Sequence, residues 1–163
     1  MQTRRELSRL GRPLCACSGS GVFVGYASLF GERDQSGDVV MPGAFAASLK
    51  KRRAADVRML FQHDAAEPVG SWIDIYETPK GLHVTGRLDR NVQRGRELFS
   101  LLESKGIDGL SIGFKTVRAR RDRASASRLL TEIDLWEISL VTFPMLMGAR
   151  VTGFTRATSG KGK

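Results

Sequence analysis

Apolar and polar residues alternate along much of the chain between residues 22 and 143, and a period of two predicts β-strands. We expect strands over 22–30, 57–63, 70–76, 82–88, 110–120 and 129–143. The turn formers Pro79 and Gly81 join the third and fourth strands into a hairpin. A polar, basic loop, RRDRASAS, joins the last two into a second hairpin.

Two segments follow helical spacing instead. Phe45 and Leu49 fall four apart within 44–53, where the cations gather in the last turn and oppose the helix dipole favourably. Within 92–105, three leucines share one helix face, Asn91 is the predicted N-cap and Gly106 the glycine after the helix. Strands with two helices in one short chain predict a mainly β fold, a barrel or sandwich with helical additions.

Composition limits the class of protein. The chain has 163 residues, 41% of them hydrophobic, which suits one compact domain with a core. We expect a flexible basic arm over 1–20, the folded domain over 21–153 and a flexible tail over 154–163.

No apolar run approaches the ~18 residues of a membrane-spanning helix, so we expect neither export nor membrane insertion. Cys15 and Cys17 are too close in sequence for a disulfide framework, and we expect free thiols and no metal or cofactor.

The charge balance is basic, with 26 Lys and Arg against 17 Asp and Glu and a net charge of +9. The positive residues concentrate in the arm, in 50–58, in 115–128 and after residue 150. Such a surface attracts acidic protein segments or nucleic acid through contacts that weaken with salt, unless it is simply a solvated surface. No recognised nucleic-acid motif or aromatic stacking ladder supports nucleic-acid binding.

Only two histidines are present, so any imidazole base is His63 or His83. His83 falls on the polar face of its strand, and we expect it to be solvated. His63 ends an apolar strand face and precedes Asp64 and a predicted loop, AAEPVG, a place where a strand delivers a side chain to a cleft. A purely structural histidine is the alternative for His63.

Ser111 lies between Gly109 and Gly113, on the strand face opposite Leu110 and Ile112. The glycines leave room for close approach of a backbone, and we expect a substrate backbone there. The string GLSIG matches the nucleophile elbow of α/β-hydrolases, but both histidines precede the serine, which excludes that chain order. A small structural residue is the alternative.

Glu137 shares a strand face with Ser139 and Val141, among many apolar neighbours. A buried carboxylate requires a hydrogen-bond donor, and an imidazole N–H is one. An arginine, Arg87 or Arg118, is the other expected partner. The remaining acids proposed for the same task are Asp134, Glu132 and Asp64.

Several motifs together resemble one known family. GYASLFGERDQSGDVVMPGAF, LFQHD followed by PVG, GLHVTGRL, DGLSIGF and EISLVTFP are similar to the prohead proteases of tailed phages and related gene-transfer elements, over residues 22–144. The resemblance implies a serine endopeptidase with the herpesvirus assemblin fold, a compact antiparallel β-barrel surrounded by helices. It places the base on His63, the nucleophile on Ser111 and the third member on Glu137. Arg150 is its candidate for the oxyanion loop, where MLMGAR departs from the family pattern.

The same resemblance implies where the protein acts and on what. Its expected partners are the major capsid protein, with its scaffolding segment, or a separate scaffold protein. We expect it to work in the host cytoplasm inside the assembling prohead and to cleave itself, and self-association is a further expectation. Two alternatives remain from the residues alone: a catalytically silent scaffold-binding assembly module, and a basic nucleic-acid-binding barrel.

Overall fold

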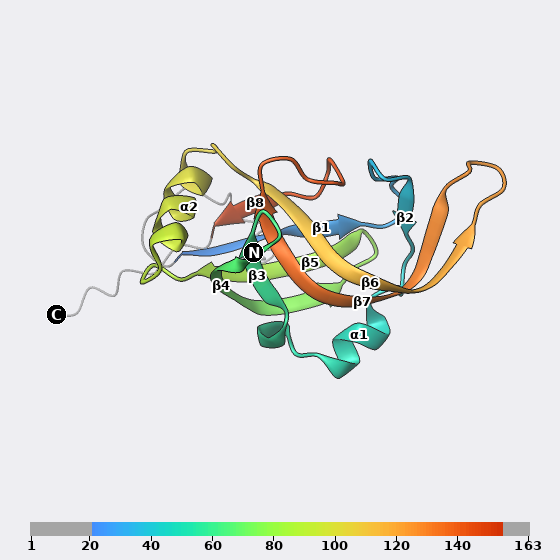
Figure 1. Ribbon diagram of the computed structural model, residues 1–163, viewed down its shortest axis with the longest axis horizontal. Helices are drawn as coiled ribbons and strands as arrows, with labels where there is room; N and C mark the ends of the chain where they lie inside the picture. The colour runs from blue at the N-terminus through green and yellow to red at the C-terminus, as the bar shows by residue number, and fades with distance from the viewer. Residues whose placement is uncertain (1–20, 155–163) are drawn as a thin grey trace, which may run out of the picture.

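The computed structural model of the protein describes residues 21–154, so the predicted arm, the two cysteines and most of the tail lie outside the described residues (Figure 1). The described part contains eight strands, two α-helices and one short 3-10 helix. In chain order these are β1 (Val22–Leu29), β2 (Asp38–Val40), α1 (Ala46–Lys51), η1 (Ala54–Asp56), β3 (Arg58–Phe61), β4 (Asp64–Glu77), β5 (Gly81–Leu88), α2 (Gln93–Glu103), β6 (Gly109–Arg121), β7 (Arg128–Val141) and β8 (Val151–Phe154).

All eight strands belong to one strongly curved sheet, in the order β2-β7-β3-β4-β5-β1-β8, with β6 paired to the other edge of β7. Most neighbours are antiparallel, but β7 runs parallel to both β2 and β3. Strand β7 therefore pairs with three other strands, and it brings residues of β3 and β6 next to its own. Figure 1 shows β6 and β7 as a long curved hairpin whose tip extends beyond the rest of the sheet.

The sheet curls toward closure without completing a barrel. An isolated bridge joins Gly109 at the start of β6 to Arg150, just before β8. Two hydrogen bonds flank it, from Leu110 N–H to Ala149 O (2.9 Å) and from Val151 N–H to Asp108 O (2.8 Å). The predicted antiparallel barrel is thus a mainly antiparallel, incompletely closed sheet.

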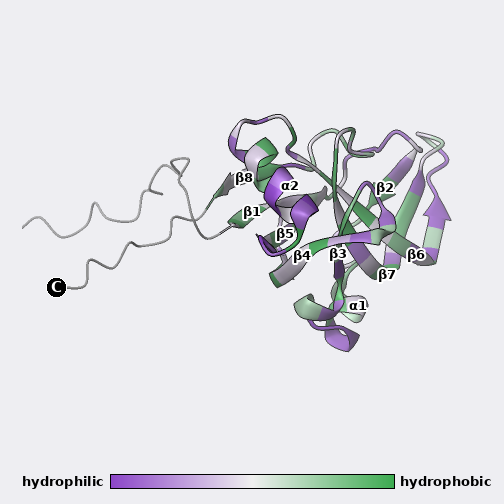
Figure 2. Cartoon of the chain, turned by 60° about the vertical axis from the view of Figure 1, so that its left-hand side comes forward, coloured by the Kyte–Doolittle hydropathy of each residue, from purple (hydrophilic) through white to green (hydrophobic). Residues whose placement is uncertain are grey.

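The core lies inside this curl. Its largest fully buried side chains include Phe23, Trp72, Met59 and Ile138, and the Phe23 and Trp72 rings meet edge to face at 5.6 Å. Figure 2 shows hydrophobic residues concentrated on the strands of the body, whereas the β6–β7 tip is largely hydrophilic. Within residues 21–154, no helix is long and apolar enough to span a membrane.

The predicted strands and helices are present with shifted ends, and four short features differ from the prediction. β2 and β8, of three and four residues, were not predicted. The predicted loop after His63 is instead the start of β4. Helix α2 begins after Val92, and Asn91 does not cap it through its side chain. Short strands carry too few alternating positions to show a period of two.

Candidate active site

His63 lies in a tight turn between β3 and β4 and not on a strand. The two residues that connect Phe61 to Asp64, Gln62 and His63, have φ angles of 55° and 59°. Positive φ at both positions is typical of a type I′ hairpin turn, which favours Asn and Gly because most other side chains are strained there. The prediction that His63 continues the apolar strand face is therefore wrong, because the left-handed backbone redirects its imidazole.

Strand β7 and the residue after it hold this turn in place. Gln62 donates its backbone N–H to Leu140 O (2.9 Å) and its side-chain amide to the Thr142 hydroxyl (2.6 Å). The backbone N–H of His63 donates to Ser139 Oγ (3.0 Å). These hydrogen bonds stabilise a backbone conformation that would otherwise be unfavourable. The position of the imidazole is thus determined by β7.

The Glu137 carboxylate contacts the His63 ring directly. Glu137 Oε1 hydrogen-bonds to Nδ1 of His63, and Oε2 accepts a hydrogen bond from the Ser139 hydroxyl (2.7 Å). The hydrogen bond to Glu137 raises the pKa of His63, although partial burial of the ring opposes this. Because Nδ1 carries the proton toward the carboxylate, Nε2 is left as the basic nitrogen. Of the two kinds of partner predicted for Glu137, the imidazole is the one it contacts, and Arg118 pairs with Glu132 (3.3 Å).

Ser111 lies opposite Ser139 in the antiparallel β6–β7 ladder, so the two side chains share a face of the sheet. Ser139 is fully buried, and its hydroxyl is engaged by both His63 and Glu137. Ser111 is 6% exposed, and within residues 21–154 its hydroxyl has no hydrogen bond and is not sealed from solvent. Of the two serines, Ser111 is the one whose hydroxyl is free to react.

An imidazole held by a carboxylate, with a free serine hydroxyl opposite the Ser139 that contacts both residues, has the components of a serine hydrolase site. Residues 14–161 match the family model of the caudovirus prohead serine proteases. The chain belongs to this family.

Two prohead proteases resemble the chain in sequence. It is 36% identical to that of Enterobacteria phage HK97 over 126 residues, which is 76% of this chain and 56% of the phage protein. It is 29% identical to that of Escherichia phage T5 over 113 residues, 69% of this chain and 53% of that protein. The chain therefore spans about half the length of these relatives.

Two solved structures share the fold of this prohead protease family member. The bacteriophage T4 capsid assembly protease superposes with a TM-score of 0.60 at 11% identity, covering 74% of this chain and 80% of that one. The KSHV protease, solved with a hexapeptide phosphonate inhibitor, gives 0.54 at 13% identity, covering 80% and 64%. The predicted herpesvirus-protease-like, mainly β fold is confirmed.

At the two glycines that flank Ser111, Gly109 and Gly113, the space that a side chain would take is filled by other residues of this protein. A Cβ on Gly113 would lie 2.0 Å from Glu137 Oε1, and one on Gly109 would lie 2.5 Å from the Val141 carbonyl oxygen. Real Cβ contacts are longer than 3.0 Å. The expectation that these glycines admit a substrate backbone is therefore wrong. Gly113 instead leaves the space that the Glu137 carboxylate fills to reach His63.

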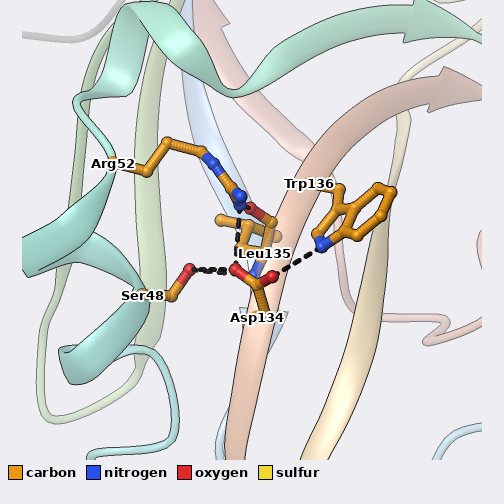
Figure 3. Close-up of polar contacts among 5 residues, drawn as sticks. All are labelled: Ser48, Arg52, Asp134, Leu135 and Trp136. Atoms are coloured by element: carbon orange, nitrogen blue, oxygen red, sulfur yellow. Dashed lines mark hydrogen bonds and ion pairs between the residues drawn. The ribbon is translucent and has the colours of Figure 1, made fainter.

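The other acids proposed for the third position have different partners. Asp134 accepts hydrogen bonds from Arg52 (3.0 Å), Trp136 (2.7 Å) and Ser48 (3.4 Å), as Figure 3 shows. The hydrogen bond from Trp136 is the main cause that lowers the pKa of Asp134. Asp64 accepts from a backbone N–H two residues further along the chain. Neither is hydrogen-bonded to the His63 ring.

Arg150 is not directed at the catalytic candidates. Its guanidinium pairs with Asp108 (2.5 Å) and donates to the Met147 carbonyl (2.9 Å), and its own carbonyl accepts from Tyr26 N–H (3.1 Å). It thereby ties the loop that leads into β8 to the residue before β6. Arg150 makes no hydrogen bond to Ser111 or His63 within residues 21–154.

His83 is half-buried, whereas the sequence predicts a solvated side chain. Its neighbours across both strand pairings are tyrosines, and its ring lies 5.3 Å from that of Tyr26 and 5.0 Å from that of Tyr76. Its Nδ1 is buried without a hydrogen-bond partner. Alternation along one strand could not show that aromatic residues on both neighbours would cover the ring.

Ser139 and Gly113 are functional candidates that sequence reasoning missed as such. Alternation predicts that Ser139 shares a face with Glu137, and Gly113 lies two residues after Ser111, but neither pattern indicates a contact with the carboxylate. Within residues 21–154, no three or more His, Cys, Asp or Glu side chains lie close enough together to hold a metal ion.

Proposed function

We propose that this chain is a serine endopeptidase that acts during capsid maturation, with Ser111 as nucleophile, His63 as general base and Glu137 as the acid that orients the histidine. One observation carries the assignment: Ser139 joins the His63 turn and the Glu137 carboxylate, and lies directly opposite Ser111. Membership of the prohead protease family supports the same chemistry.

In the proposed reaction, Ser111 Oγ attacks the carbonyl carbon of the scissile peptide bond while His63 Nε2 takes its proton. Glu137 stabilises the resulting imidazolium and keeps the proton on Nδ1. As the C–N bond breaks, His63 returns the proton to the departing amine, and the acyl group remains on Ser111 as an ester. Water, deprotonated by His63, then releases the carboxylic acid and restores the serine.

No hydrogen bond joins His63 to Ser111 in this structure, although both belong to the described residues. Hydrogen bonds between catalytic groups often form only when substrate is bound. We therefore expect the His63 side chain to rotate toward the serine in the complex, with the Glu137 carboxylate following it, while β7 keeps the backbone of the turn in place.

For Arg150 we propose a supporting role. Its pairing with Asp108 connects the loop over 142–150 to the residue three positions before Ser111. An ordered loop there could supply the backbone donors that stabilise an oxyanion.

The proposed substrates are a scaffold protein or the scaffolding segment of the capsid protein, cut inside the assembling prohead, together with the enzyme itself. Co-expression of the chain with the capsid protein from the same genome, followed by mass spectrometry of both, tests this. We expect a shortened capsid protein with the native chain and an intact one with Ser111→Ala. An uncleaved capsid protein in both cases would favour a silent scaffold-binding module.

A further inference from the structure

A groove of about 670 Å³ is lined by His63 and Glu137 but not by Ser111. Its walls are mostly apolar. They include Val57, Leu60, Ala65, Pro68 and Trp136. Grooves of this size with mainly apolar walls and a few polar groups bind small ligands and side chains.

Trp136 faces this groove because of a β-bulge. In the β6–β7 ladder, Gly113 pairs with Glu137 and Phe114 with Leu135, so Trp136 is an extra residue without a partner on β6. Unbroken alternation along β7 would put Trp136 on the same face as Ile138, which is fully buried, but Trp136 is 57% exposed. The bulge turns Trp136 and Glu137 toward the same groove.

The indole is held at its polar edge and open elsewhere. Its Nε1–H donates to Asp134 (2.7 Å) (Figure 3). Ser48 in helix α1 and Arg52, the residue after the helix, also donate hydrogen bonds to Asp134. Arg52 donates to the carbonyl of Leu135 as well. Within residues 21–154, the ring has no aromatic or cationic stacking partner. An oriented and exposed tryptophan is the kind of side chain that dominates binding energy at recognition sites.

The position of the groove indicates which part of a substrate it receives. In the mechanism proposed above, His63 passes the serine proton to the departing amine, so the leaving segment must lie against His63. Ser111, which holds the acyl segment in that mechanism, does not line the groove, whereas His63 does. The leaving segment therefore runs from His63 into the groove.

Resting on the proposed function, we propose that the groove beside Trp136 binds an apolar side chain on the C-terminal, leaving-group side of the scissile bond. Trp136 is then a specificity-determining residue. It recognises the segment that leaves with a new N-terminus when the peptide bond is cleaved.

The test compares substrates that share one acyl part, taken from the cleavage site found by mass spectrometry. One peptide carries leucine after the scissile bond, a second carries glycine, and the third substrate is a methyl ester with no residue on that side. Trp136→Ala and Trp136→Phe are measured beside Val117→Ala, a control on the β6–β7 hairpin whose side chain is similarly exposed, at 51%.

We expect Trp136→Ala to lower kcat/KM about 10- to 200-fold for the leucine peptide, the range for an apolar contact in a binding pocket. Hydrolysis of the methyl ester should be unchanged, the preference for leucine over glycine should disappear, and Trp136→Phe should retain part of it. Val117→Ala should match the native chain on all three substrates.

An equal loss on peptide and ester would overturn the proposal, because Trp136 would then support the catalytic groups. Unchanged rates on every substrate would also overturn it. A change in oligomeric mass for Trp136→Ala, measured by light scattering together with loss on all substrates, would show that the groove is an interface between copies instead. If the native chain cleaves neither peptide nor ester, the proposed function itself fails and the groove assignment with it.

Discussion

Gly113→Ala tests whether the space beside Ser111 exists for the Glu137 carboxylate. The new Cβ would lie 2.0 Å from Glu137 Oε1 and 2.7 Å from Glu137 Cγ. Ordinary contacts begin near 3.4 Å, so the oxygen must move by about 1.4 Å and the rest of the side chain must shift with it. A carboxylate at the end of a flexible side chain can move this far with little cost to folding, but it then leaves Nδ1 of His63.

We expect kcat/KM to fall by about 10²-fold, the loss typical of a 1 Å misplacement, and by up to ~10⁴-fold if the imidazole tautomer is lost as well. The assay is peptide hydrolysis, with thermal unfolding measured on the same preparation. The matched control is the Glu137→Ala background, where no carboxylate remains to be displaced.

In that background Gly113→Ala should cost almost nothing further, because the two substitutions act through one contact. A Gly113→Ala variant with native activity would refute the reasoning. So would additive losses in the double variant, since the alanine would then be acting on something other than Glu137.

Two other predictions address the same site. Glu137→Gln should keep the fold and lower turnover by ~10⁴-fold. Because the carboxylate raises the pKa of His63, the acid limb of the pH–activity profile should move to lower pH in this variant. An acid limb that does not move would contradict the assignment. Ser139→Ala removes the acceptor for His63 N–H and a donor to Glu137, and should lower both the melting temperature and kcat; unchanged kinetics would show that Ser139 does not position them.

The sequence predicted much of the fold because its long strands alternate clearly. The two hairpins, β4–β5 and β6–β7, follow directly from their periodicity and turn residues. The short strands β2 and β8 were missed, and the parallel pairing of β3 with β7 could not be predicted, since local patterns do not specify which distant strands meet. That pairing is what brings His63 to Glu137.

The sequence indicated which residues are candidates for the site but not how they are arranged in space. A carboxylate among apolar residues requires a donor, and the imidazole is one of the two kinds of partner predicted for Glu137. The turn at His63 was missed because a non-glycine residue with positive φ carries no signal in the alternation pattern. The bulge at Trp136 was missed because the alternation pattern assumes an unbroken register. The requirement for glycine at position 113 was missed because it comes from the side chain of Glu137 on another strand.

The central claim is that Ser111 is a nucleophile activated by His63. The most direct measurement is reaction of the folded chain with a fluorophosphonate, followed by mass spectrometry of the modified peptide. A single adduct on Ser111 is predicted, absent in Ser111→Ala and strongly reduced in His63→Ala, with His83→Ala labelled like the native chain. Labelling at Ser139, or equal labelling of the native chain and His63→Ala, would contradict the claim.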